Sequence, residues 1–396
     1  MTPWILARRI AALAPSSTAA AGRKARALAA SGVDVVDLSI GEPDFPTPAF
    51  VGRAGARAIE AGRTRYTDVA GEAALRDAVA DKYVREQGAR ASRENVIVTA
   101  GAKQAVFNAC TALFDEGDAV ALFSPYWVSF PEMVRLTGAV PVFVPTAIAK
   151  GWPPTAEALD RHAPERLRGV ILNSPNNPTG ACVAPDELSR IVDWCAAREA
   201  WLIYDETYDR FLYDGRRHAS AAALRSRYER IVVTGAASKT WAMTGWRLGW
   251  VLGPAELVTA IGSYQSHTTS NASSISQAAA LEALTDLDAT SAAVAGMLAR
   301  YTERRKIMVE GLSAVDGIRC PLPEGAFYAF ADVSALQWRK NVTGSAAFCD
   351  RLLEEAHVAA VPGDAFGDDS CVRFSFATDE ARIREGVRRI AAWAAR

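Results

Sequence analysis

The sequence has few residues of the kinds that build metal centres and disulfide frameworks. Its six cysteines, at positions 110, 182, 195, 320, 349 and 371, include no C-x-x-C pair, and its four histidines include no H-x-x-x-H pair. Both absences argue against a zinc site and against a disulfide framework. We therefore expect no bound metal and a reducing compartment, the cytoplasm.

Long apolar runs and an excess of one charge are also missing. No segment approaches the ~18 to 20 apolar residues of a membrane span. The first residues, MTPWILARRIAALAPSSTAA, carry paired arginines, but the apolar run after Arg9 is only about five residues long, too short for an export signal. We interpret this segment as an amphipathic arm. The formal net charge of −1 gives no electrostatic reason to expect nucleic acid or a membrane as partner, so a small-molecule substrate is the default.

The chain is long and rich in apolar residues. Its 396 residues exceed what one hydrophobic core usually organises, and 50% of them are hydrophobic. We expect two domains that pack closely together.

Short apolar runs alternate with helical stretches in the first two thirds of the chain. They lie at residues 95–99, 119–123, 169–173, 201–204 and 231–234. Because each run is continuously apolar, we expect strands that are covered on both faces, and the alternation with helices indicates a mostly parallel sheet. The sequence therefore predicts an α/β fold, with residues 48–285 as the large domain.

The last third of the chain has a different pattern. A long alanine-rich helical region at 276–313 leads to apolar segments at 325–330 and 371–376 and then to a final helix. This pattern predicts a smaller α+β domain over residues 286–396. The apolar segment 35–40 should join it, so residues 1–47 are interpreted as an N-terminal arm and part of the small domain.

One lysine is surrounded by small residues at the end of a predicted strand, which a lysine on a solvated loop would not require. Residues 235–250, GAASKTWAMTGWRLGW, place Lys239 among small residues just after a predicted strand, with Arg247 eight positions further on. In open α/β sheets, ligands are usually held at such strand ends. Lys239 is therefore a candidate for chemistry.

Three further segments place polar residues after predicted strands. Residues 173–180 (NSPNNPTG) form a loop that two prolines and a glycine hold in a fixed path, although a plain turn is an alternative. Asp205 and Tyr208 follow the strand at 201–204, where the carboxylate could also cap a helix. Residues 99–104 (TAGAKQ) lead into a helix whose free N–H groups favour an anion, a signal that is weak by itself.

Taken together, these candidate residues would suit a ligand that has a phosphate, a cationic ring nitrogen, a polar ring substituent and an aldehyde. Pyridoxal phosphate has all four, and a lysine Schiff base with an aspartate partner for the ring is a known pattern. The motifs SPNNPTG, YDETY, SKTWAMTGWRLGW, SPYWVSFPE, IGEPDFPTP and RFSFA resemble those of class I pyridoxal-phosphate-dependent aminotransferases, most of all the bacterial aspartate aminotransferases. The resemblance implies fold type I, in which a mostly parallel central sheet flanked by helices forms the large domain beside a smaller α+β domain.

The resemblance also implies how the cofactor, pyridoxal 5′-phosphate, is held. Lys239 would form the Schiff base and shuttle the proton, and Asp205 would pair with the ring nitrogen. Tyr208, the third catalytic residue, would hydrogen-bond the phenolic oxygen of the cofactor. The other implied cofactor contacts are Asn177 on the phenolic oxygen, Trp127 stacked on the ring, and Ser238, Arg247, the backbone of Gly101, Ala102 and Lys103, and Tyr66 of the neighbouring subunit on the phosphate.

Substrate contacts are implied in the same way. Arg373 would bind the α-carboxylate through its planar fork, supported by Gly41, Asn177 and Trp127. Lys103, helped by Ser16 and Thr18, would bind a distal carboxylate, or would be a solvated lysine at a helix start.

The implied reaction is a ping-pong transfer of the α-amino group between aspartate or glutamate and 2-oxoglutarate or oxaloacetate, as in amino-acid biosynthesis. Ala14 stands where prephenate-using relatives tend to carry lysine, which argues against prephenate. A symmetric homodimer with shared active sites is also implied.

Other functions remain as alternatives. One is an aminotransferase for aromatic or specialised amino acids, and another is a β-lyase or synthase of the same fold type. A pyridoxal-phosphate-binding transcription regulator would need a DNA-binding domain beside a fold that takes up the whole chain. A purely structural role conflicts with charged groups at strand ends, because buried unpaired charges are costly.

Overall fold

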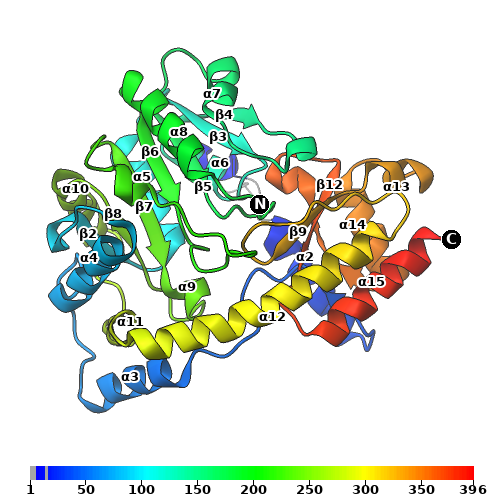
Figure 1. The fold of residues 1–396 in the computed structure, drawn as a ribbon, viewed down its shortest axis with the longest axis horizontal. Helices are drawn as coiled ribbons and strands as arrows, with labels where there is room; N and C mark the ends of the chain where they lie inside the picture. Colours follow the sequence, from blue (N-terminus) through cyan, green and yellow to red (C-terminus); the bar gives the residue numbers. More distant parts are fainter. Residues whose placement is uncertain (1–5, 14–16) are drawn as a thin grey trace, which may run out of the picture.

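The computed structural model describes residues 6–13 and 17–396 (Figure 1). Near the N-terminus, α1 (Arg8–Ala11) precedes α2 (Ser17–Ala30). The expectations for Ala14 and Ser16 lie outside the described residues. Among the described residues, no helix has both the length and the apolar character needed to cross a membrane.

A seven-stranded sheet forms the centre of the fold (Figure 1). Its order is β2-β8-β7-β6-β5-β3-β4, and β8 alone runs antiparallel to its neighbours. The strands are β2 (Val96–Thr99), β3 (Ala119–Ser124), β4 (Val140–Pro145), β5 (Gly169–Asn173), β6 (Trp201–Asp205), β7 (Ile231–Ala236) and β8 (Gly249–Leu252). The predicted mostly parallel sheet and its five predicted strands are confirmed.

Two strands of this sheet were not predicted. Edge strand β4 reads VPVFVP, and its prolines are tolerated there because an edge strand leaves some N–H groups unpaired. Strand β8 is only four residues long and follows the loop that comes after α9 (Ala237–Thr240), the short helix that carries Lys239. Neither sequence reads as a buried parallel strand.

Helices cover both faces of the sheet. On β6, Leu202 and Tyr204 join one apolar cluster while Ile203, between them, joins another on the opposite face. Continuous apolarity therefore corresponds to burial on both sides, as expected from the period of two. Helices α3 (Ala49–Glu60), α4 (Ala73–Gln87), α7 (Ala156–His162), α8 (Pro185–Ala197) and α11 (Ser274–Thr285) contribute to the first cluster, and α5 (Ala102–Leu113), α6 (Phe130–Leu136) and α10 (Ala255–Ser266) to the second.

Two small sheets lie beside the large one. Strand β1 (Val36–Asp37) pairs in parallel with β10 (Val358–Ala359), and β11 (Val361–Pro362), β12 (Cys371–Ser375) and β9 (Tyr328–Asp332) form an antiparallel sheet. The segment near residue 36 therefore pairs with a strand of the C-terminal third. The helices of this part are α13 (Ser334–Arg339), α14 (Ser345–Ala356) and α15 (Glu380–Ala394).

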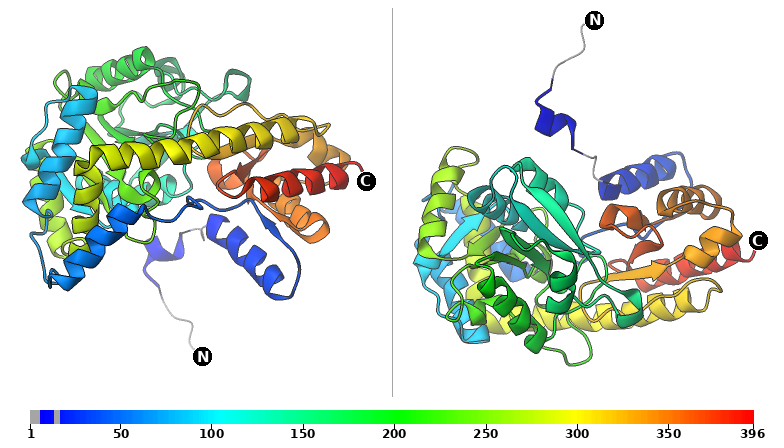
Figure 2. Two further views of the ribbon diagram at one scale, coloured as in Figure 1. Left: turned by 60° about the horizontal axis from the view of Figure 1, so that its bottom comes forward. Right: turned by 90° about the horizontal axis from the view of Figure 1, so that it is seen from above.

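The predicted helical region at 276–313 consists of two helices. Helix α11 ends at Thr285, and α12 (Leu287–Ser313) begins after Asp286, whose carboxylate caps it by accepting from the Ala289 N–H at 3.1 Å. Figure 2 shows α12 running from the side of the large sheet to α15. We propose residues 48–285 and 286–396 as the two domains, joined by this long helix.

The remaining helices are short. Helix α9 (Ala237–Thr240) follows β7, and 3₁₀ turns occur at Arg93–Asn95, Ile148–Lys150, Ala221–Leu224 and Gly363–Phe366.

Candidate active site

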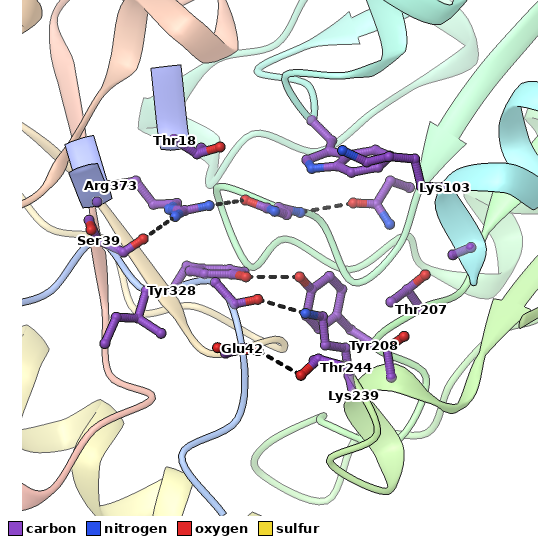
Figure 3. Close-up of a pocket in the computed structure, with 18 of the residues that line it drawn as sticks. Thr18, Ser39, Glu42, Lys103, Thr207, Tyr208, Lys239, Thr244, Tyr328 and Arg373 are labelled. Atoms are coloured by element: carbon purple, nitrogen blue, oxygen red, sulfur yellow. Dashed lines mark hydrogen bonds between the residues drawn. The ribbon is translucent and has the colours of Figure 1, made fainter. Parts of the chain in front are cut away.

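A cavity of about 700 Å³ opens where the central strands end (Figure 3). Asn173 and Asp205, the last residues of β5 and β6, line it, and α5 and α9 enter it after β2 and β7. The predicted site residues that line it are Gly41, Ala102, Lys103, Trp127, Asn177, Asp205, Tyr208, Ser238, Lys239, Arg247 and Arg373. The structure thus brings together side chains from distant parts of the chain.

Lys239 projects into this cavity from α9. Its Nζ donates a hydrogen bond to the Gly41 carbonyl at 2.6 Å. Burial lowers the pKa of Lys239 to about 8, although the nearby Glu42 carboxylate acts in the opposite direction. A lysine with this pKa is partly in the neutral, nucleophilic form near pH 8.

Asp205 is buried at the end of β6. Its Oδ1 accepts hydrogen bonds from the Thr207 N–H at 3.0 Å and the Thr207 hydroxyl at 2.6 Å. Burial raises the pKa of Asp205 to about 6 despite these bonds. No helix follows Asp205, so the helix-cap alternative is wrong and the carboxylate faces the cavity.

Tyr208 is a buried neighbour of Asp205. Its hydroxyl lies 2.9 Å from the hydroxyl of Tyr328, and the two rings meet edge to face at 81°. Burial raises the pKa of Tyr208 well above its ordinary value, so the hydroxyl is protonated and can donate a hydrogen bond.

Residues 173–180 form a tightly held loop, as the two prolines indicated. The Ser174–Pro175 and Asn177–Pro178 peptide bonds are both cis. The Asn177 N–H donates to Oδ1 of Asn173 at 2.9 Å. Its own Oδ1 accepts from Nη1 of Arg373 at 3.0 Å, so the loop orients the guanidinium.

Arg373 is a buried cation without an acidic partner among the described residues. It is 2% exposed, its Nη2 donates to the Ser39 carbonyl at 2.8 Å, and its Nε is buried without a hydrogen bond. The guanidinium also lies 4.4 Å from the centre of the Tyr328 ring. Burial lowers the pKa of Arg373, which marks the cost of an uncompensated charge. A ligand carboxylate would offset that cost.

The start of α5 offers a site for an anion. Gly101, with φ +89°, caps the helix, and the first backbone N–H groups of α5 lead into the cavity at Ala102 and Lys103. The Arg247 guanidinium donates to the Ala100 carbonyl at 3.2 Å, and a Cβ on Gly101 would lie only 2.6 Å from its Nη2. Glycine at 101 therefore leaves the space that the guanidinium fills.

Trp127 and Lys103 line the cavity side by side. The Lys103 ammonium lies 5.1 Å from the centre of the Trp127 ring, within the range of a cation–π contact. Partial burial lowers the pKa of Lys103, and the charge of Arg247 lowers it further. Lys103 forms no ion pair among the described residues, so its charge is available to a ligand.

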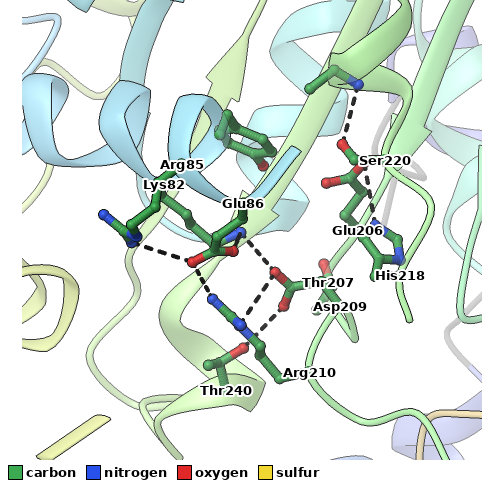
Figure 4. A network of polar contacts seen from close by, with 12 residues as sticks. Lys82, Arg85, Glu86, Glu206, Thr207, Asp209, Arg210, His218, Ser220 and Thr240 are labelled. Atoms are coloured by element: carbon green, nitrogen blue, oxygen red, sulfur yellow. Dashed lines mark hydrogen bonds and ion pairs between the residues drawn. The ribbon is translucent and has the colours of Figure 1, made fainter. Parts of the chain in front are cut away.

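A buried polar network connects the segment that carries Tyr208 to the helix that carries Lys239 (Figure 4). Asp209, next to Tyr208, accepts from the Lys82 ammonium at 2.8 Å and from the Thr240 hydroxyl at 3.2 Å. Thr240 adjoins Lys239 on α9. Burial by itself raises the pKa of Asp209, but the charges of Lys82 and Arg210 outweigh it and lower the pKa to about 2. The carboxylate is therefore ionised and links α4, α9 and the turn after β6.

Two predicted site residues do not line the cavity. Gly101 acts through the backbone next to it, whereas Tyr66 is 90% exposed on the surface of the chain. Its proposed role needs a second subunit and stays a prediction.

Several cavity residues were missed. Glu42 belongs to the quoted motif IGEPDFPTP, and Tyr328 to a segment that was read only as a strand. Asp37 is the last residue of β1 and Ser39 follows that strand, whereas Arg26 lies on α2, where no motif signals a site.

Comparison with known proteins gives consistent matches over nearly the whole chain. The family model described as aminotransferase class I and II matches residues 33–390. The probable aspartate/prephenate aminotransferase of Aquifex aeolicus is 41% identical over 386 residues, which cover 97% of this chain and 97% of that protein. The aspartate/prephenate aminotransferase of Thermus thermophilus is also 41% identical, with 98% of each chain covered.

Solved structures show the same similarity in three dimensions. The aspartate aminotransferase of Thermus thermophilus with maleate superposes with a TM-score of 0.93 at 40% identity, covering 98% of this chain and 100% of that one. The aspartate aminotransferase of Rhizobium meliloti gives a TM-score of 0.93 at 38% identity and covers 100% of both chains.

Proposed function

Because the chain belongs to the class I and II aminotransferase family, we propose that it moves the α-amino group between L-aspartate or L-glutamate and a 2-oxo acid, with pyridoxal 5′-phosphate as cofactor. The single observation that carries the substrate class is Arg373, a buried guanidinium that has no acidic partner among the described residues. Every α-amino acid and 2-oxo acid brings the carboxylate that this cation needs.

The residues present fit the cofactor. The first backbone N–H groups of α5, beside the Arg247 guanidinium that packs against Gly101, suit a phosphate. The Asp205 carboxylate suits a protonated ring nitrogen, and a positive charge in front of it would bring its raised pKa back down. Lys239 supplies an amine that can bind the aldehyde carbon. Trp127, Asn177, Tyr208 and Ser238 complete the proposed set.

When bound, the cofactor supplies an electron sink for the pair of electrons that remains on the substrate α-carbon after its proton is removed. The chain supplies the rest. The Lys239 amine would take the proton from the substrate α-carbon and would hold it for the later return step. The Asp205 carboxylate keeps the ring nitrogen protonated, and Arg373 holds the α-carboxylate so that the C–H bond stays near Lys239.

Dicarboxylic substrates are proposed because a second, unpaired cation lines the cavity. Lys103 enters from α5 with its charge available to a distal carboxylate. Thr18, from α2, lines the same cavity. The names of relatives support this substrate class, and one related structure is described with maleate, itself a dicarboxylate. Those names also include prephenate, but Ala14 still predicts that prephenate is a poor substrate here.

We further propose a cytoplasmic homodimer with shared active sites. The support is the exposed Tyr66, which is not among the described residues that line the active-site cavity of its own chain but would suit a phosphate in a neighbouring subunit. The proposed small-molecule partners are an amino acid and a 2-oxo acid.

The visible spectrum of the purified protein with added cofactor tests the proposal. The yellow band of the bound cofactor should fade when L-aspartate is added and return with 2-oxoglutarate, because each addition completes one half of the ping-pong cycle. If aspartate does not change the band, the proposed substrate would be contradicted and the proposed cofactor would stand. A protein that never turns yellow would contradict both.

The same experiment separates the alternatives. A β-lyase would release a 2-oxo acid and ammonia from one substrate, and its band would return without an added acceptor. An enzyme for aromatic amino acids would respond to L-phenylalanine more strongly than to L-aspartate. The relatives support an aminotransferase over a lyase or synthase.

A further inference from the structure

We propose that Arg26, on α2, determines substrate specificity by binding the distal anionic group of the substrate side chain. This inference rests on the proposed function, because it concerns which amino acids the site accepts. Arg26 would act with Lys103, so that two cations from different elements meet a side-chain carboxylate.

The face of α2 that meets the cavity carries Arg26. Thr18, Gly22 and Arg26 all line the cavity, and their spacing of four residues places them on one side of the helix. Long side chains on a helix lean toward its N-terminus, so the guanidinium of Arg26 extends back over Gly22. A Cβ on Gly22 would lie 3.2 Å from Nη1 of Arg26. Glycine at this position therefore leaves room for the guanidinium against the helix.

The charge of Arg26 is not used by the protein itself. Arg26 forms no ion pair and no hydrogen bond among the described residues, whereas its neighbour Lys24, on another side of α2, pairs with Asp350 at 2.5 Å. An arginine without a partner at a cavity wall is available to a ligand anion.

The charges that line the cavity favour an anionic ligand. Five basic side chains, of Arg26, Lys103, Lys239, Arg247 and Arg373, face three acidic ones, of Asp37, Glu42 and Asp205. Two of the acids are engaged locally, since Asp37 accepts from the N–H and the hydroxyl of Ser39 and Glu42 accepts from the Thr244 hydroxyl. With Arg373, Arg247 and Lys239 assigned to other groups, Arg26 and Lys103 remain for the side chain. The ligand class is therefore α-amino acids whose side chain ends in a carboxylate.

The test compares Arg26→Gln with a matched control, Arg23→Gln. Arg23 is an exposed arginine of the same helix that does not line the cavity. Steady-state kinetics with L-aspartate, L-glutamate and L-alanine should give a fivefold to tenfold lower kcat/KM for the better dicarboxylic substrate in Arg26→Gln, about the loss expected for one charge-assisted contact near solvent. The value for L-alanine should stay within about twofold, because alanine has no distal charge.

Equilibrium binding gives a second readout that does not depend on turnover. Calorimetric titration should show weaker binding of glutarate, a dicarboxylate, to Arg26→Gln and unchanged binding of butyrate, a monocarboxylate of similar shape. Arg23→Gln should match the unaltered protein for both ligands. Arg26→Lys should recover part of the glutarate affinity, since it restores charge without the planar fork.

Three results would overturn the assignment. Unchanged kinetics and glutarate binding in Arg26→Gln would mean that Arg26 does not reach the ligand. An equal loss for L-alanine, or for butyrate, would mean that Arg26 supports the site in general rather than the side chain. If Arg23→Gln had the same effect as Arg26→Gln, the overall charge of α2 would explain both effects. If the unaltered protein transaminated none of the three amino acids, the proposed function would fail, while glutarate binding would still report on Arg26.

Discussion

At the scale of single residues, burial changes the chemistry of ordinary side chains. Lys239 and Asp205 line one cavity with pKa values of about 8 and about 6, both moved toward neutrality by burial. Arg373 cannot lose its proton at any accessible pH, so its burial creates a demand for an anion instead. These three groups thus prepare the site to react through an amine, to pair with a ring cation and to bind a carboxylate.

Lys239→Ala should abolish transamination, because it removes the amine that is proposed to move the proton at the α-carbon. The expected loss in kcat is at least about a thousandfold, within the range for a general base. The substrate and phosphate contacts lie elsewhere, so the variant should still bind the cofactor noncovalently. Lys306→Ala, at an exposed lysine of α12, is the control. Full turnover by Lys239→Ala would refute the assignment.

The lowered pKa of Lys239 also predicts a pH dependence in the cofactor-free chain. Only the neutral amine attacks an aldehyde, so the rate of covalent cofactor uptake should rise with pH up to about 8 and level off above it. Stopped-flow absorbance between pH 6 and 10 measures this rate. A rate that kept rising to pH 10 would indicate a lysine with an ordinary pKa.

Asp205→Asn should make the cofactor-free chain more stable while it abolishes efficient turnover. In the folded chain the pKa of Asp205 is about 6, against 3.8 ordinarily, so the folded state binds more protons between these values and loses stability as pH rises through them. At about 1.4 kcal/mol per unit, the cost above pH 6 is about 3 kcal/mol. Asparagine avoids this cost and can still accept both bonds from Thr207.

Thermal unfolding at several pH values checks this prediction. The variant should melt higher than the unaltered chain at pH 8, and the gap should close as pH falls toward 4. Asp81→Asn, at an exposed aspartate of α4, should show no such gap. A gap that stayed constant with pH would show that ionisation of Asp205 is not its source.

At the scale of elements, the ends of the strands position the catalytic candidates. A buried ion pair then holds the neighbouring elements in place relative to one another. Asp209 receives bonds from Lys82 of α4 and Thr240 of α9, so three elements share one carboxylate. The sequence pattern did not indicate this contact, because Lys82 and Asp209 are 127 residues apart and lysine on a helix is usually solvated.

Lys82→Met should destabilise the chain by about 3 to 5 kcal/mol, because it leaves the buried Asp209 carboxylate without its main counter-charge. Urea unfolding at pH 7 measures the loss. Adding Asp209→Asn to Lys82→Met should restore part of the stability, since the orphaned charge is gone. Lys306→Met is the surface control. A loss below about 1 kcal/mol would mean that the pair is solvated or replaceable.

Individual elements differ in how well their sequences predict them. Strands β5 and β7 are buried throughout and β6 is buried except at Trp201, so their continuous apolarity identified them. Strand β4 lies at an edge with several exposed residues and two prolines, so it lacks that signature. Strand β8 is buried, but its apolar run is only part of a four-residue strand and is too short to identify it. The break between α11 and α12 depends on one capping residue, Asp286, within an otherwise helical composition.

At the scale of the whole molecule, the proposed shared site predicts complementation between subunits. Lys239→Ala subunits by themselves should be inactive, and Tyr66→Ala subunits by themselves should be weakly active at limiting cofactor. In a mixed dimer one site would carry both defects and the other neither. Random mixing of equal amounts should therefore recover about a quarter of the activity of the unaltered enzyme.

Sedimentation and activity after co-refolding measure this effect. Mixing Lys239→Ala with Asp205→Asn subunits is the control, because both residues belong to one chain's cavity and each site then keeps a defect. No recovery with Tyr66→Ala, in a protein that sediments as a dimer, would place Tyr66 outside the partner's site. A stable monomer with full activity would contradict the shared site itself.

The sequence by itself determined the α/β class, most strands of the central sheet and the motifs that end them. These features depend on residues close together in the chain, where periodicity, proline and glycine act locally. The tertiary structure alone decided which distant groups meet, such as Arg373 with Asn177 and Ser39, Tyr208 with Tyr328, and Arg26 with the same cavity. Such contacts follow from how sheets and helices pack, and local patterns carry no record of that packing.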